Sequence, residues 1–182
     1  GVSYCATCDA AFFKNKVAGV LGSNEETAHE AIFLTRFVEQ LYLFCPKGQL
    51  EAAPELIEEI ENNKKIKVFY RTNVSKIIGD KTVNSVEINS QEGKSTLPIN
   101  GLFIFTQGNK PIVDYILDVP MSGEGCLLVN DEMATNIPGI FACGDIICNK
   151  VQQAIVAAGQ GCIAALSADK YINKRSKTKK DY

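Results

Sequence analysis

The chain has 182 residues, enough for one large domain or two small ones. Its 46% hydrophobic and 22% charged residues are ordinary for a globular protein, and a formal net charge of −2 gives no reason to expect nucleic-acid binding. No apolar run approaches the roughly 20 residues that a membrane-spanning helix needs, and the first residues lack the layout of a secretory signal. We therefore expect neither nucleic acid nor a membrane among its partners.

The cysteines are seven in number, and their spacing is not that of a disulfide framework. The sequence therefore predicts a reducing, cytoplasmic setting, in which any disulfide is catalytic and transient. Most of them are interpreted as small apolar residues without a redox role. This group comprises Cys45, Cys126, Cys143, Cys148 and Cys162.

Apolar strands alternate with amphipathic helices in the first half of the chain. The pattern predicts strands over residues 16–22, 40–44 and 66–70, with helices over 25–37 and 51–61 between them. This order favours a parallel sheet with right-handed crossovers. Short alternating segments over 72–97 predict an antiparallel meander laid onto that sheet, and 101–105 reads as another buried strand.

A hinge is predicted near residues 108–111, where glycine, asparagine and proline gather. Beyond it, residues 140–145 predict a strand that ends in Gly-Asp, and a last helix is expected over about 153–171. We therefore divide the chain into three parts. They are a first domain over 1–107, a second over 108–173 and a basic, frayed tail over 174–182.

The sharpest chemical feature is Cys5-Ala6-Thr7-Cys8-Asp9. Two cysteines separated by two residues can close a small disulfide ring and exchange with a partner's disulfide through a thiolate, and Asp9 could supply the proton. The alternatives are a zinc half-site or two buried thiols. A zinc site needs further ligands at suitable spacing, and the single histidine, His29, has none nearby. Redox chemistry is therefore favoured, and no metal site is expected.

Two segments at opposite ends of the chain resemble the low-molecular-weight, flavin-dependent thioredoxin reductases. Residues 4–13 resemble the active-site segment of that family, and residues 138–145 resemble its second flavin motif. Gln153-Ala154 is similar to the helix start that faces the flavin. The resemblance implies an α/β, two-domain flavoprotein disulfide reductase fold, with a Rossmann-like parallel sheet, an antiparallel meander and part of a second, FAD-binding domain.

The resemblance also implies a role for each site residue. Cys5 would attack the disulfide of thioredoxin, Cys8 would face the flavin, and Asp9 would be the acid–base partner. The expected enzyme reduces thioredoxin with FAD as cofactor, and acts as a homodimer whose domains rotate between two arrangements. The flavin contacts expected in the second domain are Gly144, Asp145, Gln153 and Ala154.

The nucleotide site departs from the family pattern. Where the family has a glycine-rich turn, this chain reads Gly22-Ser23-Asn24-Glu25-Glu26, so carboxylates stand where a phosphate would bind. Where the family has an arginine cluster for the 2′-phosphate, residues 45–51 offer Lys47 alone. This pattern is similar to the ferredoxin-dependent flavin thioredoxin reductases. Reduced ferredoxin is therefore the favoured electron donor, and NADPH is the alternative.

Other departures affect how much of the enzyme this chain represents. The family's first flavin motif, a second glycine-rich turn, does not occur, so we interpret the chain as a fragment that binds FAD weakly or not at all by itself. Ala10 replaces a glycine and Gln152 an arginine of the family pattern. The functions left open are an ordinary NADPH-dependent thioredoxin reductase, a peroxiredoxin reductase, a small-molecule disulfide oxidase and a non-catalytic binding module on the same fold.

Overall fold

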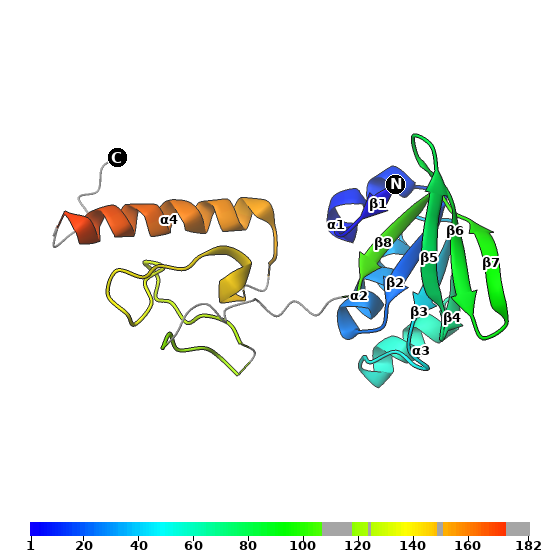
Figure 1. Ribbon diagram of the computed structural model, residues 1–182, viewed down its shortest axis with the longest axis horizontal. Helices are drawn as coiled ribbons and strands as arrows, with labels where there is room; N and C mark the ends of the chain where they lie inside the picture. Colours follow the sequence, from blue (N-terminus) through cyan, green and yellow to red (C-terminus); the bar gives the residue numbers. More distant parts are fainter. Residues whose placement is uncertain (107–117, 124, 149–150, 174–182) are drawn as a thin grey trace. The chain divides into compact units, whose positions relative to one another are not determined.

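The computed structural model describes residues 1–106, 118–123, 125–148 and 151–173. The chain divides into two compact units, Gly1–Gly108 and Asn109–Tyr182, which are coloured blue to green and yellow-green to red in Figure 1. The predicted hinge near 108–111 and the predicted frayed tail over 174–182 lie outside the described residues. Across the described part of the chain, no helix is both long and apolar enough to cross a bilayer.

Five parallel strands form the centre of the first unit, in the order β1-β8-β2-β3-β4. The strands are β1 (Val2–Ser3), β2 (Val17–Gly22), β3 (Gln40–Cys45), β4 (Ile66–Tyr70) and β8 (Gly101–Phe105). Helix α2 (Glu25–Leu34) connects β2 to β3, and α3 (Pro54–Asn62) connects β3 to β4. This arrangement is the parallel sheet with helical crossovers that the sequence predicts.

A second, antiparallel sheet lies against the parallel one (Figure 1). It consists of β5 (Asn73–Gly79), β6 (Val83–Ser90) and β7 (Gly93–Pro98). Alternation along the parallel strands divides the apolar side chains between two cores. Val20 and Leu43 pack with residues of α2 and α3, whereas Phe44 and Leu102 pack with Val86 of the meander. The unit therefore has three layers, and both faces of its central sheet are covered.

The second unit has a much smaller core. Its described residues include the 3₁₀ turn η2 (Gly144–Ile147) and the long helix α4 (Ala154–Ile172), in which no residue is buried. The buried apolar residues among those described are Val119, Cys126, Leu127 and Ala142. The strand predicted over 140–145 is wrong, because Phe141 makes only an isolated bridge and the chain turns at Gly144 in the left-handed region, with φ +79°.

Two further expectations require correction. The second helix begins at Pro54 rather than at residue 51, because the segment before it forms an isolated bridge between Glu51 and Asn24. Cys126 and Cys148 form a disulfide, with their Cα atoms 5.5 Å apart. The interpretation of these two cysteines as small apolar residues is therefore wrong. The remaining cysteines, Cys45, Cys143 and Cys162, are free thiols.

Candidate active site

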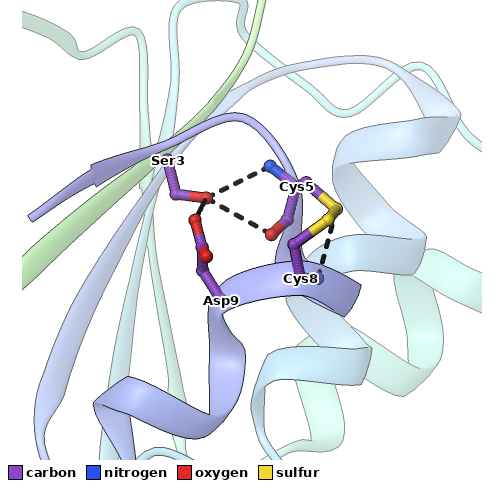
Figure 2. The surroundings of a disulfide bond; sticks show 4 residues. All are labelled: Ser3, Cys5, Cys8 and Asp9. Atoms are coloured by element: carbon purple, nitrogen blue, oxygen red, sulfur yellow. Dashed lines mark hydrogen bonds between the residues drawn. A yellow bond between two sulfur atoms is a disulfide. The ribbon is translucent and has the colours of Figure 1, made fainter. Parts of the chain in front are cut away.

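The dithiol lies at the start of a short helix, α1 (Ala6–Asp9), which follows β1 and runs into the 3₁₀ turn η1 (Ala10–Phe13). Cys5 and Cys8 form a disulfide, with their Cα atoms 5.3 Å apart (Figure 2). Cys5 caps the helix, and its Sγ accepts a hydrogen bond from the backbone N–H of Cys8 at 3.1 Å. A donor at this position stabilises negative charge on sulfur, so it favours Cys5 as the thiolate of the reduced pair.

Asp9 is held in place by Ser3, a residue that the sequence analysis missed. The Ser3 hydroxyl donates to Asp9 Oδ2 at 2.7 Å and accepts from the Cys5 backbone N–H at 3.2 Å (Figure 2). Ser3 lies on β1 and is only 4% exposed, so the sheet fixes its position. The structure therefore joins the carboxylate to the backbone of the first cysteine through one buried hydroxyl. A serine on a two-residue strand gives no signal in the sequence.

A second carboxyl group, that of Glu30 in α2, also contacts helix α1. The backbone N–H of Ala6 donates to the Glu30 carboxylate, while Oε2 of that carboxylate is buried and has no partner among the described residues. Burial, followed by the charge of Glu26, raises the pKa of the Glu30 carboxyl. Acidic residues on helices are normally solvated, so the sequence analysis passed over Glu30.

The segment expected to bind a nucleotide makes close contacts within the chain itself. A Cβ on Gly22 would come within 2.6 Å of the carbonyl oxygen of Phe105 in β8 and within 3.0 Å of Cγ2 of Thr27 in α2, so strand and helix both pack tightly on β2 here. Asn24 caps α2 through its side chain, which accepts from the Thr27 N–H at 2.9 Å. The Glu51 N–H donates to the Ser23 carbonyl at 2.7 Å. The loops after β2 and β3 are therefore bonded to each other.

An acidic groove of about 680 Å³ lies beside these loops, between α2 and α3. Glu25, Glu51 and Glu61 line it, together with Tyr70. Lys47, the base expected to face a phosphate, is paired with Glu51 instead. Removal from solvent and the neighbouring Glu61 raise the pKa of the Tyr70 hydroxyl. The described lining of the groove therefore carries negative charge.

The residues expected to hold the flavin lie together in the second unit, where η2 packs against α4. The N–H of Gly144 donates to Gln160 Oε1 at 2.8 Å, and Asp145 is exposed at the start of the turn. Gln153 precedes α4 in an extended conformation without capping it through its side chain, and Ala154 is exposed. A carboxylate for sugar-type hydroxyls and a helix start for ring carbonyls are chemically suited to a flavin.

The described residues contain no cluster of three or more histidine, cysteine or acidic side chains that could hold a metal ion. The chemistry available in the first unit is therefore that of a dithiol with two nearby carboxyl groups. A family model described as pyridine nucleotide-disulphide oxidoreductase matches residues 7–161. The chain belongs to the pyridine nucleotide-disulphide oxidoreductase family. Membership in this family implies a flavin, FAD, as cofactor.

Proteins similar to this chain include thioredoxin reductases. One from Aquifex aeolicus is 41% identical over 180 residues, which make up 97% of this chain and 56% of that protein. The chain thus spans little more than half the length of such relatives. The crystal structure of a thioredoxin reductase from Streptococcus pyogenes matches 96% of this chain and 58% of its own, at 32% identity and a TM-score of 0.84. The two-domain α/β flavoprotein disulfide reductase fold predicted from the sequence is therefore confirmed.

A more distant structure bears on the choice of electron donor. A ferredoxin-flavin thioredoxin reductase from Clostridium acetobutylicum matches 96% of this chain and 56% of its own, at 27% identity and a TM-score of 0.50. This neighbour and the thioredoxin reductase from Streptococcus pyogenes share one fold with this chain, so the fold does not discriminate between donors.

Proposed function

We propose that this chain is the dithiol-bearing part of a flavin-dependent thioredoxin reductase that takes its electrons from reduced ferredoxin. The observation that carries the proposal is the Cys5–Cys8 disulfide at the start of α1, with Asp9 held beside it by Ser3. A disulfide between cysteines with two residues between them, next to an oriented carboxyl group, is suited to exchange with another disulfide. FAD, the expected homodimer and a cytoplasmic location belong to this proposal.

The dithiol passes two electrons to the substrate in two displacements. The Cys5 thiolate attacks the thioredoxin disulfide, forms a mixed disulfide and releases one substrate thiolate. The Cys8 thiolate then attacks Cys5, which restores the Cys5–Cys8 disulfide and releases the second substrate thiolate. Asp9 donates a proton to a departing sulfur and recovers it when the pair is reduced again. The bound flavin supplies the two electrons for that reduction.

Asp145 and Gln153 are proposed to hold the flavin in the second unit, together with Gly144 and Ala154. Gly144 allows the chain to turn with φ +79° and so presents the Asp145 carboxylate on the surface of the unit. An alanine at position 144 would have to adopt a left-handed conformation that only glycine tolerates well. The turn and the helix start would therefore bind the cofactor's ribityl hydroxyls and ring edge.

Ferredoxin is proposed as donor because the carboxylates of the acidic groove would repel the phosphates of a nucleotide. Three carboxylates and no lysine or arginine are among the described residues that line the groove, and Lys47 beside it is paired with Glu51. A nucleoside diphosphate in the groove would meet like charges. The competing candidate is NADPH, which the description of the family as pyridine nucleotide-disulphide oxidoreductases favours.

The test uses the full-length, flavin-loaded protein under anaerobic conditions. Flavin absorbance is followed as NADPH, NADH or reduced ferredoxin is added, with thioredoxin present in a second series. We expect bleaching by ferredoxin alone, and transfer of the electrons to thioredoxin. In the matched Asp9→Asn variant, bleaching should persist while thioredoxin reduction falls about a hundredfold. Rapid bleaching by NADPH would overturn the choice of donor, and bleaching without thioredoxin reduction would overturn the choice of substrate.

A further inference from the structure

We propose that Cys126 and Cys148 form a second redox couple, and that its disulfide holds the turn which carries Asp145. The two cysteines belong to different segments of the second unit, 22 positions apart. Their Cα atoms are 5.5 Å apart, within the usual range for a disulfide. The mechanism proposed for the Cys5–Cys8 pair makes no use of them.

One partner, Cys126, lies in a hairpin that is already attached to the turn. Met121 and Leu127 pair across this hairpin, and the Ser122 N–H donates to the Cys126 carbonyl at 2.8 Å. The N–H of Leu127 donates to the carbonyl of Ile146, within η2, at 3.0 Å. A backbone hydrogen bond therefore connects the hairpin and the turn, and the disulfide adds a covalent connection next to it.

The other partner, Cys148, ends the turn in a conformation that needs support. Its φ of 49° lies in the left-handed region, which residues other than glycine seldom adopt. Its N–H donates back to the carbonyl of Asp145 at 3.0 Å and so closes η2. The disulfide fixes Cys148 in this conformation, and reduction allows it to return to the right-handed or extended region. The position of Asp145 is thus coupled to the state of the pair.

The pair is built for slow, one-sided exchange. Cys126 is 3% exposed, whereas Cys148 is half-buried, so an external thiol reaches the sulfur of Cys148 first. The thiolate of the external thiol forms a mixed disulfide with Cys148 and expels the Cys126 thiolate. A second external thiol then attacks the mixed disulfide and releases Cys148. The sum is a protein disulfide and two thiols giving two protein thiols and one external disulfide. Glutathione, reduced or oxidised, is a suitable external couple.

The expected consequence concerns flavin retention, and this step rests on the flavin contacts proposed for Asp145. While the disulfide is closed, the turn is held ready to bind. If reduction leaves about one molecule in ten with the turn in place, the apparent affinity for FAD falls about tenfold. The couple thereby links cofactor binding to the thiol state of the surroundings.

The first experiment identifies the disulfide in the full-length protein. The protein is equilibrated with oxidised or reduced glutathione, quenched with acid, alkylated, digested and analysed by mass spectrometry. We expect a cross-linked peptide pair that contains Cys126 and Cys148 after oxidation, and two alkylated peptides after reduction. Cys143 and Cys162 should be alkylated in both samples. Full alkylation of Cys126 and Cys148 after oxidation would overturn the proposal whatever the protein's enzymatic function proves to be.

The second experiment measures the dissociation constant of FAD in a Cys8→Ser background, which removes the dithiol of the first unit. Reduction with a phosphine should weaken FAD binding about tenfold in this parent. The added Cys126→Ser change should give the weak value with or without the phosphine, whereas the control change Cys162→Ser, on the exposed face of α4, should keep the response. An unchanged dissociation constant, with the pair shown by mapping to be reduced, would refute the proposed coupling to flavin while leaving the disulfide itself established.

Discussion

The two disulfides of this chain differ in where the structure places them. Cys8 is exposed and Cys5 half-buried, and a carboxyl group is held beside them by a buried hydroxyl. Cys126 is buried, and backbone hydrogen bonds close the hairpin and the turn around the second pair, while the Cys126 N–H also donates to the Ser122 hydroxyl at 3.3 Å. The first disulfide is open to another protein, whereas the second connects two segments of one unit.

This difference follows from loop length and surroundings rather than from the sulfur chemistry. Closing a ring across two intervening residues removes less freedom from the unfolded chain, about 2 kcal/mol in the chain-entropy model. Connecting positions 22 apart removes more, about 3 kcal/mol in the chain-entropy model. The unit that holds the second disulfide has few buried apolar residues among those described, so that contribution matters there.

The largest effect is expected from Cys8→Ser, which tests whether the first disulfide is the one that exchanges. Thioredoxin reduction by the full-length protein should fall by about three orders of magnitude or more, because Cys8 is the thiol that releases the mixed disulfide. A stable mixed disulfide between Cys5 and thioredoxin should accumulate and be seen on a non-reducing gel. The matched control, Cys162→Ser, should reduce thioredoxin at the wild-type rate. An adduct on any other cysteine contradicts the assignment.

The next effect concerns stability and tests whether the second disulfide is structural. Cys148→Ser should lower the free energy of unfolding of the second unit by about 3 kcal/mol under oxidising conditions. Under reducing conditions the variant and the wild type should differ little, since both then lack the bond. Urea unfolding of the full-length protein, followed by fluorescence and circular dichroism, measures both values. Equal unfolding midpoints under oxidising conditions would show that the bond contributes nothing.

The same contrast explains what the sequence could and could not predict. The strands β2, β3 and β4 were predicted from apolar runs and their periodicity, because buried parallel strands leave that pattern. The Cys5–Cys8 pair was predicted because its members are near neighbours in sequence. The Cys126–Cys148 pair was missed because its members meet only through tertiary structure, after the hairpin and η2 have come together.

The errors at single residues have similar causes. The strand expected over 140–145 was inferred from an apolar run, but the left-handed Gly144 redirects the chain before a ladder can form. Ser3 and Glu30 were missed because serine and glutamate are common residues, and their roles depend on partners in α1. The pattern of apolar residues can be read along the sequence, whereas the orientation of a carboxyl group depends on partners that folding brings together.

A smaller effect is expected at Ser3, which tests whether the surroundings of the first disulfide matter beyond the sulfurs. Ser3→Ala removes a hydrogen bond to a carboxylate, about 1.5 kcal/mol, so thioredoxin reduction should slow about tenfold. Ser3→Thr keeps the hydroxyl and should restore the rate. If Ser3→Thr is as slow as Ser3→Ala, the hydrogen bond from the hydroxyl to Asp9 does not contribute to the rate.

The smallest effect is expected at Glu30, and it concerns pH. Burial and the charge of Glu26 raise the pKa of the Glu30 carboxyl above its ordinary value of 4.5, so the folded protein keeps this proton to a higher pH than the unfolded chain. The free energy of unfolding therefore falls as the pH rises from about that ordinary value through the raised value of the folded state. Glu30→Gln removes this loss and retains an acceptor for the Ala6 N–H.

The stabilising effect of Glu30→Gln should consequently be larger at pH 8 than at pH 4, where both states of the wild type hold the proton. Thermal unfolding of the full-length variant and the wild type across this range measures the difference. The control is Glu58→Gln on the exposed face of α3, measured over the same pH range. A Glu30→Gln difference that is constant with pH would mean that the carboxylate is compensated in the folded protein. The first disulfide would then lie beside a carboxyl group whose charged form burial does not disfavour.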